Sequence, residues 1–338
     1  MVSTATDVMA PAPAGLAAYL AAVEELFRAE LRSALPQVQQ LLAHVERFRG
    51  KMLRPTLVLL AGLAAQPEAT ADRPVPPLGE THLVLATVVE MVHLATLVHD
   101  DVLDQAEIRR RGATVNHLHG NEIAVLLGDW LISHAYYRCS SRAGAAAARL
   151  IGQTTNIVCE GELAQNFNRG NWSLRESDYF DIIYRKTGSL IETACRIGAA
   201  QTTSDRSTVE ALARYGRQVG VAFQIIDDVL DLTGQAKAMG KSLGTDIDRG
   251  KLTLPLIHFL ATAAPTHREL LIGLLESPEA DRVERVRQLL IPSVSVAYAR
   301  RRAEILIAQA LAAIDILPAS DARERLRYLA RMVITRQG

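Results

Sequence analysis

The chain has 338 residues, 49% of them hydrophobic and 22% charged, a composition typical of a folded globular protein. Lysine plus arginine equals aspartate plus glutamate at 37 each, so there is no basic excess that would indicate a nucleic-acid-binding protein. Three widely spaced cysteines without a C-x-x-C pair exclude a cysteine-rich metal site and favour reduced thiols: Cys139, Cys159 and Cys195.

The N-terminal segment is not typical of a targeting signal. Residues 1–14 are small and proline-rich, without the basic start of a signal peptide, and we expect a disordered tail there. The longest apolar tract, Leu83 to Val98, is interrupted by Glu90 and His93 and is too short for a comfortable membrane span. We therefore expect a cytoplasmic protein without an integral membrane segment.

From residue 15 onward, most of the chain has the periodicity of α-helices. Apolar residues recur at helical spacing over 16–48, where Pro36 marks an interruption, and 55–65 is rich in alanine and leucine. The four prolines of 66–80 predict a loop. Further helices are predicted over 81–104, 120–140, 143–168, 176–200, 207–232 and from 254 to the C-terminus.

One other segment interrupts this pattern. Residues 234–251 contain four glycines and no apolar periodicity, which predicts a long, charged loop of the kind that usually has a function. Strand signals are nearly absent, and no glycine-rich phosphate loop of the common types is present. We therefore predict an all-α protein with a single domain over 15–338.

Two acidic motifs with the same D-D-x-x-D spacing each follow an apolar run: Asp100, Asp101 and Asp104, then Asp227, Asp228 and Asp231. On a helix this spacing places the first and last carboxylates on one face, which His93 and Gln224 share on their respective helices. Carboxylates so close together repel one another unless a cation lies between them. Magnesium, which prefers carboxylate and phosphate oxygens, is the natural candidate, whereas zinc or iron would require histidine or cysteine ligands.

A single motif of this kind is more often a solvated turn or a helix end, but two copies after apolar runs favour a metal site. Basic residues at helix ends and glycine-rich loops favour a second anionic group, bound without metal. These residues are Lys51, Arg54, Arg109, Arg110, Lys186, Lys241 and Lys251. The sequence therefore indicates two phosphate-bearing ligands.

Seven stretches together resemble the trans-isoprenyl diphosphate synthases, which form the polyprenyl synthetase family. They are GKMLRP, HLATLVHDDVLDQAEIRRRGATVN, GNEIAVLLGDWL, EGELAQ, YRKTGSL, FQIIDDVLDLTG and GKSLGTDIDRGKLTLP. The resemblance runs from about Leu41 to the C-terminus. It implies the all-α isoprenoid synthase fold, with helices around a deep central cavity, and usually a homodimer.

The resemblance also implies roles for individual residues. Magnesium on an allylic diphosphate would be held by Asp100 and Asp104, with Asp101 beside them and Arg109 on the diphosphate, while the opposing magnesium site would comprise Asp227, Asp228 and Asp231. Isopentenyl diphosphate would be bound by Lys51, Arg54, His93 and Arg110. The allylic side would be lined by Lys186, Thr187 and Gln224, and the loop would be closed over the diphosphate by Lys241 and Lys251. A direct catalytic role would belong to Asp100, Asp101, Asp104, Lys186, Asp227 and Asp228.

The implied reaction is the head-to-tail condensation of isopentenyl diphosphate with an allylic diphosphate, in which magnesium and basic side chains neutralise the departing diphosphate. Ala95 and Thr96 are small where short-chain enzymes place an aromatic plug, which favours a product of C30 or longer. The sequence does not identify the residue that forms the floor of the product cavity; Trp130, Leu150 and Ile151 are candidates. Three alternatives remain: a short-chain synthase, a terpene cyclase and a non-catalytic subunit of a heteromeric synthase.

Overall fold

Helices make up most of the fold, together with one short pair of strands. The computed structural model describes residues 13, 15–48, 50–67, 77–110, 112–234 and 244–336. Within these residues the elements are α1 (Leu16–Glu30), α2 (Pro36–Glu46), α3 (Leu53–Ala64), α4 (Glu80–Leu103), β1 (Ile108–Arg109), β2 (Gly112–Ala113), α5 (Val115–His119), α6 (Asn121–Arg142), α7 (Gly144–Phe167), α8 (Glu176–Ile183), the π-helix η1 (Tyr184–Gly188), α9 (Ser189–Ala200), α10 (Arg206–Thr233), α12 (Thr245–Asp248), α13 (Leu254–Thr262), α14 (Pro265–Glu276), α15 (Arg282–Leu290), α16 (Val294–Ala313) and α17 (Asp321–Thr335).

The predicted all-α class is confirmed, and the long helices lie close to their predicted positions. Pro36 occupies the first turn of α2, where its missing N–H has no helical partner to lose. The loop predicted over 234–251 differs in part, because residues 245–248 form α12. The tail predicted over 1–14 lies outside the described residues apart from Pro13, and the single domain over 15–338 stays a prediction.

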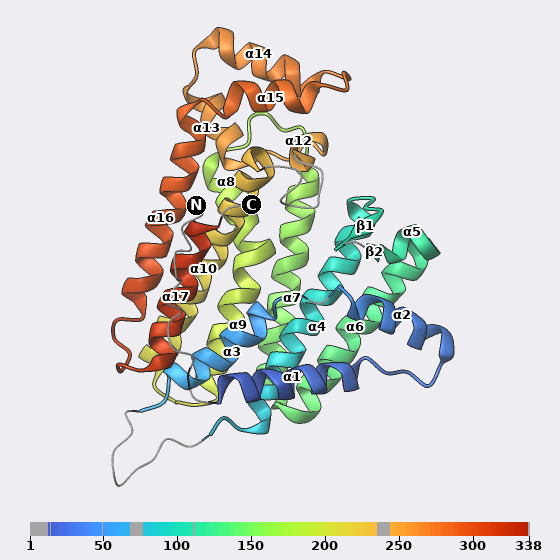
Figure 1. Cartoon of the computed structure of the whole chain (residues 1–338), viewed down its shortest axis with the longest axis vertical. Coiled ribbons are helices and arrows are strands. Elements are labelled where there is room, and N and C mark those ends of the chain that lie inside the picture. The colour runs from blue at the N-terminus through green and yellow to red at the C-terminus, as the bar shows by residue number, and fades with distance from the viewer. Residues whose placement is uncertain are drawn as a thin grey trace, which may run out of the picture.

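The long helices run side by side, with shorter ones across the two ends of the bundle (Figure 1). In this view α4, α7, α10 and α16 are close to vertical, α1 lies across the lower end, and α14 and α15 lie at the upper end. The strands β1 and β2 form an antiparallel hairpin just after α4, with Ile108 opposite Ala113. This hairpin brings Arg109 back toward the end of α4.

Helix α4 forms part of the hydrophobic core. It is apolar around much of its circumference, which is typical of a buried helix, and Leu85, Val88 and Val89 are fully buried. By length and composition α4 is also the one helix, among the described residues, that could cross a membrane. However, 72% of its most apolar window is buried inside the protein, as in the core helix of a soluble protein.

A π-helix interrupts the segment between α8 and α9. One extra residue in the turn of η1 rotates the following side chains relative to a regular helix, and such turns frequently occur at functional sites. Neighbouring helices come unusually close here: a Cβ at Gly220 on α10 would lie 2.8 Å from the Cα of Gly188, and a Cβ at Gly161 on α7 would lie 2.8 Å from the Lys186 nitrogen. These two glycines therefore let α7 and α10 pack directly on the turn that carries Lys186 and Thr187.

Candidate active site

The two acidic motifs lie where long helices end. Asp104 caps the C-terminus of α4, and Asp231 lies in the last turn of α10. A helix C-terminus carries partial negative charge, so acidic side chains placed there require cationic partners. A cavity of about 80 Å³ lies beside the end of α10, lined by Gln165, Tyr179, Ile183, Lys186, Gln224, Asp228, Asp246, Lys251, Leu252 and Thr253. The end of α4 reaches it through Asp104, which lies 3.1 Å from Lys251 Nζ.

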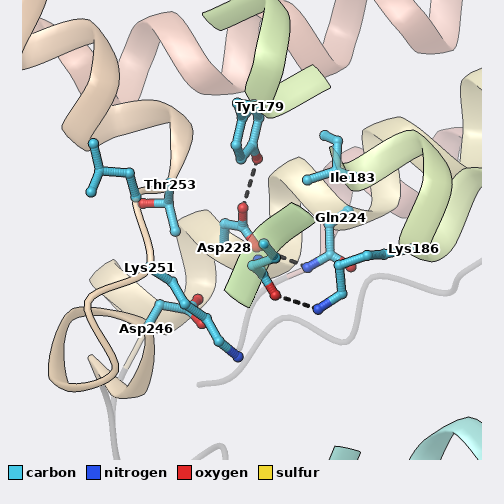
Figure 2. A pocket seen from close by; sticks show the side chains of 10 residues that line it. Tyr179, Ile183, Lys186, Gln224, Asp228, Asp246, Lys251 and Thr253 are labelled. Carbon is cyan, nitrogen blue, oxygen red and sulfur yellow. Dashed lines mark hydrogen bonds between the residues drawn. The ribbon is translucent and has the colours of Figure 1, made fainter. Parts of the chain in front are cut away.

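Asp228 is the member of the second motif that lines this cavity. Its side chain accepts hydrogen bonds from the Tyr179 hydroxyl at 2.6 Å and from Gln224 Nε2 at 2.8 Å (Figure 2). Thr187 in turn donates to Gln224 Oε1 at 2.7 Å, which fixes the orientation of the amide. Burial, followed by the charge of Asp246, raises the pKa of Asp228 well above its usual range. The site therefore places two carboxyl groups, of Asp228 and Asp246, close together inside the protein.

The other two members of the second motif have different surroundings. Asp231 accepts hydrogen bonds from the Thr245 hydroxyl at 3.0 Å and from the Asp246 backbone N–H at 3.2 Å. It thus holds the start of α12 against α10. The Asp227 side chain is 53% exposed, and one of its oxygens lies 3.9 Å from an Arg336 nitrogen. Of the three predicted ligands, Asp228 and Asp231 are therefore already engaged inside the protein, while Asp227 lies at the surface.

The aspartates of the first motif also differ in their surroundings. Asp100 is half-buried, and burial, followed by the charge of Glu162, raises its pKa to about 7. Asp101 is almost fully buried and accepts hydrogen bonds from Arg109 Nε at 2.9 Å on both carboxylate oxygens. Asp101 therefore orients Arg109, and Asp100 is the more available of the two for a cation.

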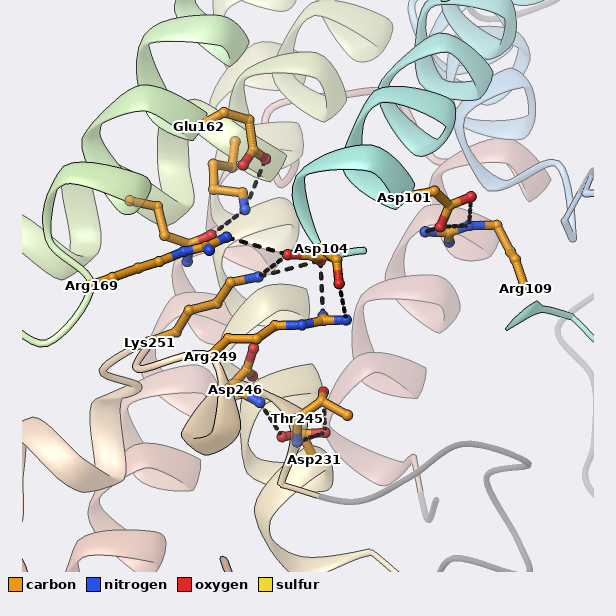
Figure 3. A network of polar contacts seen from close by, with 12 residues as sticks. Asp101, Asp104, Arg109, Glu162, Arg169, Asp231, Thr245, Asp246, Arg249 and Lys251 are labelled. Atoms are coloured by element: carbon orange, nitrogen blue, oxygen red, sulfur yellow. Dashed lines mark hydrogen bonds and ion pairs between the residues drawn. The ribbon is translucent and has the colours of Figure 1, made fainter. Parts of the chain in front are cut away.

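Asp104 lies in a network of basic side chains from distant parts of the chain. Arg249 Nη1 lies 2.9 Å from its carboxylate, Lys251 Nζ lies 3.1 Å away and Arg169 Nη2 lies 3.5 Å away (Figure 3). Lys251 was predicted at the diphosphate, whereas Arg169 and Arg249 were not. Lys241, also predicted there, lies outside the described residues.

Lys186 is held by acceptors from α7. Its ammonium group lies 2.8 Å from Glu162 and donates a hydrogen bond to Gln165. Burial lowers the pKa of Lys186, but Glu162 and Asp100 more than compensate, and the net pKa is raised. Lys186 is therefore a fixed positive charge at the cavity, suited to an anionic ligand.

A second basic site surrounds Glu90 on α4. Burial lowers the pKa of Arg54. The negative charge of Glu90 raises this pKa in part, and the positive charge of Arg110 lowers it further. Burial and the charges of Arg54, Arg110 and Arg109 lower the pKa of His93 well below its usual range, so His93 is neutral. The Arg54 Nε is buried without a hydrogen-bond partner. Such a concentration of positive charge, with Arg54 half-buried, is typical of an anion-binding site.

The backbone around this second site is strained. Met52 and Arg110 adopt positive φ angles of 53° and 47°, a conformation that residues other than glycine rarely adopt. Arg110 donates to the Phe48 carbonyl, and a Cβ at Gly50 would lie 2.6 Å from its guanidinium. Lys51, predicted to act with these residues, is exposed on the same loop. The glycine next to Lys51 therefore leaves room for the Arg110 side chain.

These motifs and this fold match known proteins. The family model for polyprenyl synthetase matches residues 35–291. The chain belongs to the polyprenyl synthetase family. It is 31% identical to the octaprenyl diphosphate synthase of Escherichia coli (strain K12), over 94% of this chain and 95% of that protein. It is 36% identical to the nonaprenyl diphosphate synthase of Mycobacterium tuberculosis, over 96% of this chain and 94% of that protein.

Solved structures of polyprenyl synthases share the fold. A polyprenyl synthase from Caulobacter crescentus CB15, complexed with calcium and isoprenyl diphosphate, has a TM-score of 0.86 and 32% identity, covering 95% of this chain and 96% of that one. A heptaprenyl diphosphate synthase from Staphylococcus aureus has a TM-score of 0.87 and 28% identity, covering 97% and 100%. The predicted family, isoprenoid synthase fold and prenyltransferase class are thereby confirmed.

The acidic side chains of this synthase fit a hard divalent cation. Among the described residues, no three histidine, cysteine or acidic side chains are already gathered around one point. However, the groups at the cavity are carboxylates, the ligands that such cations prefer, and the pKa values of Asp100, Asp228 and Asp246 are raised in part by neighbouring carboxylates. A cation between them would relieve that repulsion.

Several residues at the site were not predicted. Glu162 and Gln165 belong to EGELAQ, and Asp246 and Arg249 belong to GTDIDRGK. Both stretches contribute to the family resemblance, but the resemblance implies no role for these four residues. Tyr179 and Glu90 lie outside the acidic motifs. Only Asp246 has a usable sequence signal, as one of two aspartates in the glycine-rich loop. The other residues come together only in the folded chain.

Proposed function

We propose that this chain is a magnesium-dependent trans-polyprenyl diphosphate synthase, which condenses isopentenyl diphosphate with an allylic diphosphate. One observation supports this proposal most strongly. Carboxylates from the ends of α4 and α10 lie near one cavity, and a separate basic site of Arg54 and Arg110 lies beside Glu90 of the same helix α4. Two anionic substrates can therefore be bound side by side, only one of them through metal.

The allylic diphosphate is bound at the cavity. Lys186 and Lys251 provide fixed positive charges there, and Gln224 lines the cavity with its amide held by Thr187. The cation would be held by the predicted ligands Asp100, Asp104, Asp227, Asp228 and Asp231. When bound, magnesium neutralises charge on the departing diphosphate and so favours ionisation of the allylic C–O bond.

Isopentenyl diphosphate binds at this basic site without metal. Arg54 and Arg110 bind its diphosphate, with His93 beside them and the exposed Lys51 on the neighbouring loop. Once the allylic C–O bond breaks, its electron pair leaves with the diphosphate. The isopentenyl double bond then attacks the allylic cation to form the new C–C bond, and the diphosphate takes the proton released from the product.

We propose a long product, of C30 or more. Thr96 is half-buried one turn before Asp100, and its hydroxyl donates to the His93 carbonyl at 2.8 Å, so it does not extend as a plug. Ala95 is fully buried and has only a methyl side chain. Relatives named octaprenyl, nonaprenyl and decaprenyl diphosphate synthases support a long product over a short one.

We also propose that the synthase is a cytoplasmic homodimer without an integral membrane segment. Support for the dimer comes from large hydrophobic side chains that are exposed on α5, α6 and α7: Leu118, Ile123, Val125, Leu126, Tyr137, Leu163 and Phe167. A concentration of exposed apolar side chains favours a protein-protein contact. Light scattering of the purified chain measures the mass directly, and a monomer would contradict the dimer.

The reaction is tested with purified protein, labelled isopentenyl diphosphate, farnesyl diphosphate and Mg²⁺, followed by dephosphorylation and sizing of the prenols. We expect chains of C30 or longer, and no product when EDTA removes the metal. A product that stops at C15 or C20 with every primer would retain the enzyme class and contradict the length. The absence of any elongation would favour a requirement for a partner, as the name of one relative, heptaprenyl diphosphate synthase component 2, illustrates.

A further inference from the structure

Asp104 is contacted by three basic side chains from distant parts of the chain. Arg249, Lys251 and Arg169 all lie within 3.5 Å of its carboxylate (Figure 3). The Asp104 side chain is only 20% exposed, so water screens these charges only in part. The three cationic groups therefore share one carboxylate.

Arg249 makes the most extensive contact of the three. Besides the ion pair at 2.9 Å, its Nη2 donates to the Asp104 main-chain carbonyl at 3.1 Å. That carbonyl lies at the C-terminus of α4, where a cation interacts favourably with the helix dipole. The planar guanidinium can contact a carboxylate and a carbonyl at once, which a lysine ammonium does less well. Arg249 thus fixes both the side chain and the helix end.

We infer that Arg249 is a positioning residue. Without metal it forms an ion pair with the Asp104 carboxylate, and when metal and substrate bind together its guanidinium leaves Asp104 and binds the diphosphate. This inference rests on the proposed function. A divalent cation requires the same carboxylate oxygens that Arg249 contacts, so the two compete. A diphosphate offers the released guanidinium a bidentate partner of equal or greater strength.

The exchange makes the binding of metal and diphosphate interdependent. Metal alone would displace Arg249 from the Asp104 carboxylate and leave the guanidinium without that partner, whereas metal with diphosphate satisfies both Asp104 and Arg249. Each ligand then raises the affinity of the other by the same factor. Arg249 therefore weakens metal binding by the protein alone and strengthens binding of the metal-diphosphate pair.

The test uses Arg249→Gln in the full chain, with Arg301→Gln as control. Arg301 forms an exposed ion pair with Glu304 on α16 at 3.1 Å, so its replacement also removes one charge and one pair. Isothermal titration calorimetry measures Mg²⁺ affinity without any diphosphate, and then the affinity for inorganic diphosphate at saturating Mg²⁺. Thermal unfolding confirms that each variant is folded.

For Arg249→Gln we expect Mg²⁺ alone to bind about fivefold more tightly, because a competing ion pair is lost. Inorganic diphosphate should bind about tenfold more weakly, because a charge-assisted contact is lost. Arg301→Gln should change neither value. Equal or weaker Mg²⁺ binding in Arg249→Gln would overturn the inference, because Arg249 would then only brace the helix end. Prenol formation by the wild-type chain tests the proposed function separately, since neither titration depends on turnover.

Discussion

Asp101 holds Arg109 by a two-point ion pair inside the protein: Arg109 Nε lies 2.9 Å from both carboxylate oxygens, and Nη2 lies 2.8 Å from one of them. The Asp101 side chain is 2% exposed, so the pair is shielded from solvent on the carboxylate side. The pair ties the β1–β2 hairpin to the last turn of α4. Asp101 therefore contributes to the first acidic motif by orienting an arginine.

Replacing Asp101 by Asn should release Arg109. The variant keeps the shape of the side chain but leaves a partly buried guanidinium without its counter-charge, which costs about 3 kcal/mol of unfolding free energy. We expect kcat/KM for the allylic substrate to fall about 100-fold because Arg109 loses its position. Steady-state kinetics and urea unfolding measure both effects, and wild-type kinetics in this variant would contradict the role.

Replacing Glu90 by Gln should weaken binding of isopentenyl diphosphate. Glu90 is 4% exposed and opposes the electrostatic penalty of burial at Arg54 and Arg110. Without its charge the two guanidiniums repel each other and separate, so we expect KM for isopentenyl diphosphate to rise about tenfold. KM for the allylic substrate should not change. Glu304→Gln on α16 serves as the control, and an equal rise in both KM values would contradict a specific role.

The metal-free protein should lose stability as pH rises from about 4 to 7. Burial and Glu162 raise the pKa of Asp100 to about 7, and burial and Asp231 raise that of Asp246 to about 6. In this window the folded chain binds protons that the unfolded chain, with aspartate pKa values near 3.9, has released. The free energy of unfolding therefore falls with pH until both groups have ionised.

Thermal unfolding in EDTA at several pH values between 5 and 7.5 measures this slope. The Asp100→Asn variant should have a shallower slope than wild type, since Asn does not titrate, and should be relatively more stable at pH 7.5. Parallel curves for the two proteins would show that Asp100 ionises normally in the folded chain.

Gly220 on α10 packs so closely against Gly188 of the π-helix that we expect no room for an added methyl group. A Cβ there would lie 2.8 Å from the Gly188 Cα, so α10 or the π-helix must shift. We expect Gly220→Ala to cost about 2 kcal/mol of unfolding free energy and to lower kcat by displacing Lys186. Gly273→Ala on α14 is the matched control, because nothing lies within 4 Å of its added methyl group. That control should be neutral or stabilising.

Sequence periodicity predicted the helices well because their apolar faces repeat over many turns. It could not predict the π-helix at Tyr184–Gly188, since one inserted residue leaves no repeating signal. The two acidic motifs identified the ends of α4 and α10. Within the first motif, however, Asp100 and Asp101 are equivalent in sequence, and only the hairpin that returns Arg109 distinguishes them.

The basic partners of Asp104 cannot be predicted from the sequence, because they lie far from it along the chain. Arg249 lies 145 positions further along the chain and Arg169 lies 65 positions further, in segments without a local pattern that points to α4. The resemblance to the synthase family supplied Lys251 but not these arginines. Long-range ion pairs depend on how whole helices are arranged, and this arrangement cannot be read from local spacing.

A crystal structure with Mg²⁺ and an unreactive allylic thiolodiphosphate tests the central claim most directly. We expect metal between the diphosphate and the carboxylates of Asp100, Asp104 and Asp228, with Lys186 on the diphosphate and Arg54 and Arg110 left for the second substrate. A diphosphate bound at Arg54 and Arg110 alone, with no metal at either acidic motif, would contradict this expectation.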